Sequence, residues 1–243
     1  MAVYDIAGLT VSMAPHGRTA AQAEKYLSPD QSKTPDLEIN ITPALLRQAR
    51  AYYPPEVDED GIEYLLSGTA FYTKLLEHGG MLLHASCVVV DGQAYLFTAH
   101  SGTGKSTHTG LWLQKFGARA YILNDDKPAL RRINGQLCAC GTPWSGKFDI
   151  SRPENVPVAA IALLSRSKGR PNSIRRASVA ESLPKLMAQT VNKLNENHMD
   201  QLLNNLEQLV KNIPIYDLSC DMSPEAAELA WQAMRRDADG GKA

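Results

Sequence analysis

The stretch Y-L-F-T-A-H-S-G-T-G-K-S-T-H-T-G-L-W-L, residues 95–113, decides the fold. Its start, Tyr95-Leu96-Phe97, is typical of the end of a buried strand, and Thr107 to Phe116 can continue as a helix. Between them, residues 99–106 fit the phosphate-loop pattern, with alanine at the first position. The order of strand, glycine-rich turn, Gly-Lys-Ser and helix favours this interpretation over a turn that binds nothing.

The loop pattern has a specific chemistry. Backbone N–H groups and the helix N-terminus face phosphate oxygens, Lys105 adds a positive charge, and Ser106 offers an oxygen to Mg²⁺. Gly102 and Gly104 suit a backbone that needs positive φ and a close approach of the phosphate. The nucleotide-binding residues predicted in this way are Ser101, Gly102, Thr103, Gly104, Lys105, Ser106 and Thr107.

The composition is that of a globular protein with no unusual partner. Of the 243 residues, 44% are hydrophobic and 21% charged, and the formal net charge is -1. Without a basic field, we expect neither nucleic acid nor an anionic membrane as a partner. No signal peptide or membrane-length apolar run is visible, which predicts a cytoplasmic protein. The oligomeric state is left open, a homo-oligomer included.

The four cysteines, Cys87, Cys138, Cys140 and Cys220, fit neither a CxxC redox pair nor a zinc-ribbon spacing. We expect them to be small apolar core residues in a reducing compartment. Any metal would therefore be a hard ion held by oxygens and nucleotide phosphates.

Two apolar runs, residues 81–90 and 93–99, are joined through Asp91-Gly92, a strong β-hairpin signal. Because the second run delivers the phosphate loop, the strand of the loop should have an antiparallel neighbour. This predicts an α/β fold of mixed α+β type, whose sheet is partly antiparallel rather than doubly wound and parallel.

Composition divides the chain into three segments. Residues 1–80 are expected to be strands and helices that pack on the main domain and carry no chemistry. Residues 81–236 are expected to form the nucleotide-binding catalytic domain, and 237–243 a flexible tail.

Local signals predict further elements within these segments. They are strands at Tyr4–Met13, Leu37–Ile41, Pro157–Leu164 and 213–218, a hairpin at 128–139, helices opening at Thr42-Pro43, Ser178 and Ser223-Pro224, and helices at Gly68–Glu77 and His198–Asn212.

Asp125 and Asp126 follow an apolar strand shortly after the phosphate loop. This is the place where a phosphate-loop enzyme holds its Mg²⁺. A solvated turn after a strand is the alternative interpretation, and the preceding loop makes it the weaker one.

Three motifs stand in order: H-A-S-C-V-V-V from His84, H-S-G-T-G-K-S-T from His100, and L-N-D-D-K from Leu123. Together they resemble the catalytic domain of bacterial HPr kinase/phosphorylase and the nucleotide-binding half of phosphoenolpyruvate carboxykinase, over roughly residues 80–165. The resemblance implies the phosphate-loop fold of that superfamily. The chain departs from it in three ways: residues 1–80 do not resemble the N-terminal domain of HPr kinase, no segment matches the C-terminal catalytic loop of that enzyme, and the extra metal-binding lysine and histidine elements of the carboxykinases are missing.

The resemblance and the chemistry imply roles for the residues of these motifs. Lys105 would neutralise the transferred phosphoryl group, and Ser106 with one aspartate would hold Mg²⁺. By resemblance Asp126 takes the metal and Asp125 acts as the base, and the reverse assignment is left open. His84 is either a core histidine or a neighbour that tunes the pKa of the aspartates.

Other polar residues are weaker candidates. In G-T-P-W-S-G-K-F-D-I-S-R, Lys147 and Arg152 are either substrate-binding cations or ordinary surface residues. His100 and His108 flank the loop and are expected to be exposed polar positions.

The sequence thus predicts an ATP- and Mg²⁺-dependent kinase that phosphorylates a hydroxyl, first of all a serine of a protein or peptide. Two alternatives remain open. One is a kinase with a small-molecule hydroxyl acceptor, and the other is a non-catalytic ATP-binding regulatory module, which would not need the second aspartate.

Overall fold

The computed structural model describes residues 1–191 and 194–238, and the predicted hairpin forms its centre. β5 (Ala85–Val90) and β6 (Gln93–Thr98) pair antiparallel from Ala85↔Thr98 to Val90↔Gln93. Asp91 and Gly92 have φ of 51° and 76°, as a mirror-image two-residue turn requires. The hairpin prediction is confirmed.

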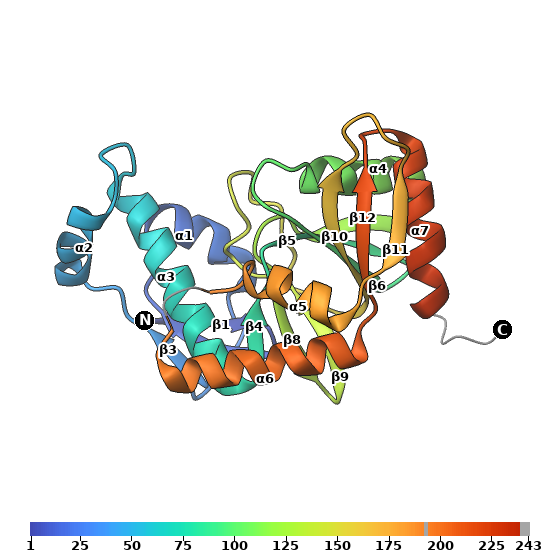
Figure 1. The fold of residues 1–243 in the computed structure, drawn as a ribbon. Helices are drawn as coiled ribbons and strands as arrows, with labels where there is room; N and C mark the ends of the chain where they lie inside the picture. The colour runs from blue at the N-terminus through green and yellow to red at the C-terminus, as the bar shows by residue number, and fades with distance from the viewer. Residues whose placement is uncertain (192–193, 239–243) are drawn as a thin grey trace.

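The nine-stranded sheet around this hairpin is mixed, as expected (Figure 1). β5 pairs antiparallel with β7 (Ala120–Asn124), and β6 pairs parallel with β10 (Asn155–Arg166). β10 also pairs parallel with β12 (Ile215–Cys220) and antiparallel with β9 (Gln136–Cys140). The remaining strands are β4 (Gly80–Leu82), β8 (Ala129–Ile133) and β11 (Ser173–Arg176). The fold is therefore α/β with parallel and antiparallel pairs in one sheet.

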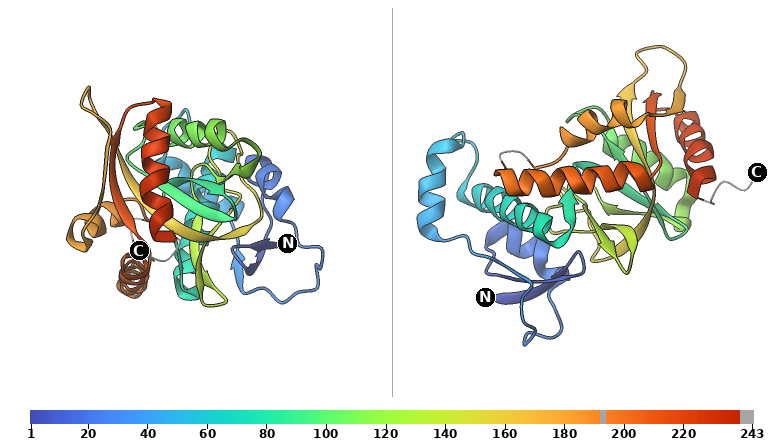
Figure 2. Two further views of the ribbon diagram at one scale, coloured as in Figure 1. Left: turned by 90° about the vertical axis from the view of Figure 1, so that its right-hand side faces the viewer. Right: turned by 60° about the horizontal axis from the view of Figure 1, so that its bottom comes forward.

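Helices cover both faces of the hairpin, which explains its continuous apolar runs. Alternate residues such as Cys87 and Leu96 face α5 (Val179–Met187) and α6 (Glu196–Asn212). Their neighbours, such as Val88 and Phe97, face α4 (Lys105–Phe116) and α7 (Pro224–Ala238), shown in Figure 2. The predicted phosphate loop therefore follows a strand that is packed on both faces.

The first 80 residues form a three-stranded sheet and three helices at one end of the main sheet (Figures 1 and 2). The elements are β1 (Ala2–Ile6), β2 (Leu9–Met13), β3 (Leu37–Ile39), α1 (Gly17–Ala23), α2 (Pro43–Ala49) and α3 (Glu59–Leu75). Their core is shared with the main domain, because Phe71 and Tyr72 of α3 pack on Trp144. Short 3₁₀ turns occur at Glu24–Tyr26, Arg50–Tyr52, Leu76–His78 and Gly117–Arg119.

Several predicted capping signals are confirmed. The Thr42 side chain accepts a hydrogen bond from Leu45 N, with Pro43 at the first helical position. Ser178 and Glu181 form the predicted capping box of α5. The predicted hairpin through Asn134-Gly135 is β8 and β9.

Some predicted boundaries were wrong. The single run Tyr4–Met13 is two strands, because a turn at Ala7-Gly8 with positive φ at both residues folds it back. The helix expected at Gly68–Glu77 begins at Glu59, where Asp58 caps it. The strand expected at Pro157–Leu164 is longer, since its ends pair with β9 and β12.

The tail prediction was wrong for its first two residues, because α7 continues to Ala238. The rest of the predicted tail, 239–243, lies outside the described residues. All four cysteines are free and buried, as expected. Within the described residues, no helix is both long and apolar enough to cross a membrane.

We predict that Gly68→Ala destabilises the fold by about 1–3 kcal/mol. A Cβ at Gly68 would lie 2.8 Å from Cδ1 of the buried Trp144, whose ring stacks on Phe71. Gly110 of α4 is the matched control, because a Cβ there meets nothing within 4 Å and alanine favours a helix by up to about 1 kcal/mol. Urea unfolding of both variants checks this, and equal midpoints would contradict the tight contact between α3 and Trp144.

Candidate functional site

The predicted phosphate loop connects the end of β6 to the start of α4. Gly102 and Gly104 have φ of 75° and 121°, conformations that glycine adopts without strain. Gly104 is the N-cap of α4, and no side chain caps the helix or adds negative charge to its first turn. The N-terminus of α4 therefore offers N–H groups and a positive dipole end to an anion.

Lys105 lies over its own loop. Its Nζ donates to Ala99 O at 3.1 Å, and the residue is buried. Burial lowers the pKa of Lys105, whereas the negative charges of Asp126 and Asp125 act in the opposite direction. Both aspartates therefore lie near enough to Lys105 to act on its charge.

Arg166, at the end of β10, holds the loop from outside. Its guanidinium donates to Thr103 O at 3.2 Å from Nε and to Gly102 O at 2.5 Å from Nη2. Sequence reasoning missed Arg166, because an arginine after a strand carries no local signal that it will meet a loop sixty residues earlier.

A cavity of about 390 Å³ lies beside the loop. It is lined by Gly102–Gly104, Thr107 and His108 of the loop and α4, by Leu164 and Arg166–Gly169, and by Cys220–Met222. The lining mixes apolar side chains such as Leu164 and Met222 with the charged side chains of Arg166, Lys168 and Asp221.

Asp125 is connected to the first turn of α4 by two hydroxyl groups. Ser86 Oγ donates to Asp125 Oδ1 at 2.6 Å and lies 2.8 Å from Thr109 Oγ1. Thr109 Oγ1 also lies 3.2 Å from Ser106 O, and its single proton can go either to this carbonyl or to Ser86 Oγ. Asp125 therefore lies on the α4 side of the site, near the backbone of Ser106. Ser86 and Thr109 were not singled out from the sequence.

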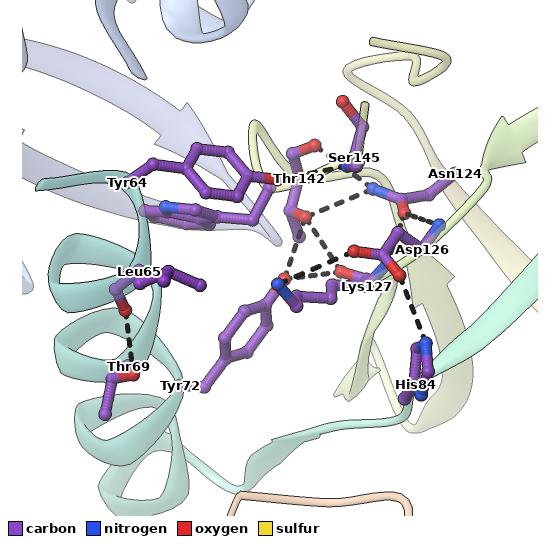
Figure 3. A network of polar contacts seen from close by, with 12 residues as sticks. Tyr64, Leu65, Thr69, Tyr72, His84, Asn124, Asp126, Lys127, Thr142 and Ser145 are labelled. Carbon is purple, nitrogen blue, oxygen red and sulfur yellow. Dashed lines mark hydrogen bonds and ion pairs between the residues drawn. The ribbon is translucent and has the colours of Figure 1, made fainter. Parts of the chain in front are cut away.

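Asp126 faces His84 and Lys127 (Figure 3). His84 Nε2 is 3.1 Å from Asp126 Oδ1, and Lys127 Nζ is 3.5 Å from Oδ2. Although burial by itself raises the pKa of Asp126, the hydrogen bond from His84 and the charge of Lys127 outweigh it, so the pKa lies below its usual value. Gln189 fixes His84 from behind, with 3.2 Å between its Oε1 and His84 Nδ1.

Asn124 fixes the turn that carries both aspartates. Its Oδ1 accepts from the backbone N–H groups of Asp126 at 3.0 Å and Lys127 at 2.8 Å. Its Nδ2 donates to both oxygens of Thr142, whose hydroxyl lies 2.9 Å from Tyr72 Oη (Figure 3). An asparagine just before Asp-Asp is a sequence signal for an Asx turn, and it could have predicted this turn.

Lys147 and Arg152 are exposed, and neither side chain has a recorded contact with the aspartates. Lys147 Nζ is 5.2 Å from the ring centroid of Phe148. The Arg152 guanidinium lies over Tyr121, and its Nη1 is 3.9 Å from Glu154. Their segment reaches the site through its backbone instead, because Ile150 O accepts from Asp125 N at 3.1 Å.

Contrary to expectation, His108 is buried, whereas His100 is exposed. Trp112 Nε1 donates to His108 Nε2 at 3.2 Å, and Cys220 Sγ is 3.8 Å from Nδ1. Burial lowers the pKa of His108 to about 4, so the ring is neutral at pH 7. The helical spacing of His108 and Trp112 places both on the inner face of α4.

Residues of α1 and α3, within the first 80 residues, contact the candidate site through Gly146. Arg18 and Gln22 of α1 both donate to Gly146 O, and Gly146 N donates to Tyr64 Oη of α3 at 3.0 Å. Gly146 lies against Asp126, because a Cβ built on it would be 3.0 Å from Asp126 Cβ.

We predict that His108 makes the protein less stable as pH falls from about 6.5 towards 4. The unfolded histidine, with its usual pKa near 6.5, binds a proton in this window and the folded one does not, so stability is lost by up to about 3 kcal/mol. Urea unfolding at pH 5 and pH 7.5 measures the change. His108→Gln should reduce this pH dependence, and His100→Gln should leave it as it is; equal pH dependence in all three proteins would contradict the buried neutral histidine.

The solved structure of the HPr(Ser) kinase/phosphatase from Coxiella burnetii is similar to the chain, with a TM-score of 0.39 and 14% identity. The match covers 65% of this chain and 93% of that one. It is a likeness of fold only. No curated protein matches the chain.

A family profile matches the chain over residues 61–234, from α3 to α7, and so includes the loop, both aspartates and His84. That range is more than half of the chain. The family is described as SynChlorMet cassette protein ScmC, and the chain belongs to it.

Proposed function

We propose that the protein is an ATP- and Mg²⁺-dependent kinase that transfers a phosphoryl group to a hydroxyl of a protein or peptide serine. The observation that carries this proposal is that Asp125 is linked through Ser86 and Thr109 to α4, the helix that begins at Lys105, with Asp126 beside it. Phosphoryl transfer needs a cation at the donor phosphate and a carboxylate at the acceptor hydroxyl, within one site.

The donor side of the proposed site is the loop and α4. Backbone N–H groups of residues 101–107 would hold the phosphates, with Lys105 neutralising the transferred group. The adjacent cavity of about 390 Å³ is large enough for a nucleoside. Arg166 would keep the loop in its binding conformation through the carbonyls of Gly102 and Thr103.

Oxygen ligands for Mg²⁺ are available at this side. No group of three or more histidine, cysteine, aspartate or glutamate side chains in the described residues could hold a metal alone. Mg²⁺ commonly takes one or two protein oxygens together with nucleotide phosphates, and the Ser106 hydroxyl with Asp125 fits that donor set. When bound, the ion supplies charge neutralisation at the phosphates.

The contacts favour exchanging the roles that the resemblance gave to the two aspartates. Asp125 is tied through Ser86 and Thr109 to the donor side, so we assign it to the metal. Asp126, oriented by His84, is assigned as the base. The acceptor hydroxyl oxygen would form its bond to the γ-phosphorus, the bond to the nucleoside diphosphate would break, and the hydroxyl proton would pass to Asp126.

A non-catalytic ATP-binding module is the other candidate, and the surroundings of Asp126 speak against it. A module that only binds nucleotide has no need of a second carboxylate. Here Asp126 is positioned by the Asn124 turn and by His84, which is itself held by Gln189.

We predict that Lys105→Ala abolishes the thermal stabilisation of the protein by Mg²⁺ and ATP. Lys105 is the one lysine or arginine of the loop pattern, residues 99–106, and it would neutralise the nucleotide phosphates. Lys115→Ala, in the same helix, is the control, since Lys115 pairs with Glu228 instead. Melting curves with and without nucleotide measure the effect. Unchanged stabilisation of the Lys105→Ala protein would remove the loop assignment.

We predict that Asp126→Asn keeps Mg²⁺-dependent ATP binding and lowers phosphoryl transfer by at least about 100-fold, since the general base is lost. Asp125→Asn should instead weaken the dependence of ATP binding on Mg²⁺. Labelled ATP incubated with the purified protein and a cell lysate measures transfer to a discrete acceptor, and nucleotide titrations measure binding.

The opposite pattern in the two variants would restore the assignment by resemblance. Absence of any labelled acceptor with the unaltered protein, together with ATP binding that survives Asp126→Asn, would favour the binding module.

A further inference from the structure

Two cations lie over one aromatic ring beside Asp126. The Arg18 guanidinium carbon is 4.1 Å, and Lys127 Nζ 5.4 Å, from the ring centroid of Tyr64. Lys127 also pairs with Asp126. Arg18 differs from it, because Arg18 has no ion pair with a carboxylate in the part of the chain that the structure describes.

Gly146 connects Arg18 to the candidate base. An Arg18 Nη2 donates to Gly146 O, and a Cβ on Gly146 would lie only 3.5 Å from Asp126 Oδ2. One residue without a side chain thus separates the guanidinium from the carboxylate. A side chain at position 146 would crowd Asp126, since its Cβ would lie 3.0 Å from Asp126 Cβ. The φ of 79° at this position also favours glycine.

The position of Arg18 is built into the contact between α1 and α3. The neighbouring Thr19 donates its hydroxyl to Glu63 Oε2, and both residues are buried. On the other side of Arg18, a Cβ on Gly17 would lie 2.1 Å from Asp60 Oδ2, so only glycine permits this approach. Arg18 is therefore held on Tyr64 before any ligand arrives, which lowers the entropy cost of using it.

These contacts leave most of the hydrogen-bonding capacity of Arg18 unused. Its recorded hydrogen bond goes to one backbone carbonyl, whereas a guanidinium has five N–H donors in a planar fork that matches a carboxylate. Arg18 and Lys127 are half-buried beside Asp126, and Asp149, the other carboxylate near Tyr64, is paired with Lys25. A further negative group would therefore be attracted to the guanidinium of Arg18.

We infer that Arg18 and Lys127 bind a carboxylate that the hydroxyl acceptor carries near its reacting oxygen. The inference rests on the proposed function, because it supposes that the hydroxyl reacts at Asp126. It gives the acceptor a chemical class: either a peptide in which an acidic side chain neighbours the serine, or a small hydroxy acid. Residues 1–80 then supply acceptor recognition, while the loop and α4 supply donor binding.

The test compares matched pairs of acids and neutral analogues on the full chain with Mg²⁺ and a non-hydrolysable ATP analogue. The probes are acetyl-Ser-Glu-amide against acetyl-Ser-Gln-amide, and glycerate against glycerol. Binding is followed through the Arg18 Nε–H resonance by NMR. We expect at least one acid to bind about tenfold or more tighter than its neutral partner, and the acid that binds distinguishes a peptide from a small molecule.

Arg18→Gln and Lys127→Gln should each remove this preference, and Arg18→Lys should restore part of it. Lys33→Gln is the control for loss of a cation, since Lys33 pairs with Asp5 of β1 instead. Equal affinity of acid and neutral probe, failure of both acids to bind, or a preference that survives Arg18→Gln would overturn the inference. In that case Arg18 serves only to hold Gly146, and Arg18→Gln lowers the melting temperature alone.

The outcomes separate the two proposals. If acid binding depends on Arg18 but the lysate assay labels no acceptor, the carboxylate subsite is supported and the kinase function is contradicted. If label is transferred but no acid binds better than its neutral partner, the kinase function is supported and the carboxylate subsite is contradicted.

Discussion

The antiparallel pairing of β5 between β6 and β7 is the constraint on which the candidate site depends. Because β5 runs against both neighbours, its first residues lie at the edge where β6 and β7 end. At that edge lie the predicted phosphate loop, which follows β6, the two aspartates, which follow β7, and His84 with Ser86 at the start of β5. In a wholly parallel sheet the amino-terminal end of a neighbouring strand would lie at the opposite edge.

The two aspartates, although adjacent in sequence, belong to different surroundings. Asp125 is hydrogen-bonded to hydroxyl groups that lead to α4, and Asp126 is hydrogen-bonded to His84 and paired with Lys127. The Asn124 turn makes this division, because it ends β7 and fixes the backbone of the following two residues. Two adjacent carboxylates in the same surroundings would repel each other and have similar pKa values. Because Asp125 and Asp126 have different hydrogen-bonding partners, they can take different chemical roles.

The sequence predicted what local signals encode. The Asp-Gly hairpin, the capping box at Ser178, the Thr42 cap and the glycine-rich connection from strand to helix are each specified by residues a few positions apart. Each of them occurs in the structure. The predictions failed where the partner is distant in sequence. The burial of His108 depends on Cys220, and no pattern near Arg166 points to the loop. The start of α3 at Glu59 is different, because its cap, Asp58, is a local signal that the prediction did not include. The contact of Arg18 with Gly146 spans 128 positions, so a reading of residues 1–80 alone assigned them no chemistry.

The hydrogen bonds of Gly146 have a consequence for how such a protein can diversify. Both of its backbone polar groups are bound by α1 and α3, and neither helix contributes to the phosphate loop. Substitutions on the inner faces of these two helices would therefore reshape the surroundings of Asp126 while the nucleotide side is left as it is. Under the proposed function, selectivity for the acceptor and affinity for the nucleotide could then change independently, and a fragment without the first eighty residues would lose the former.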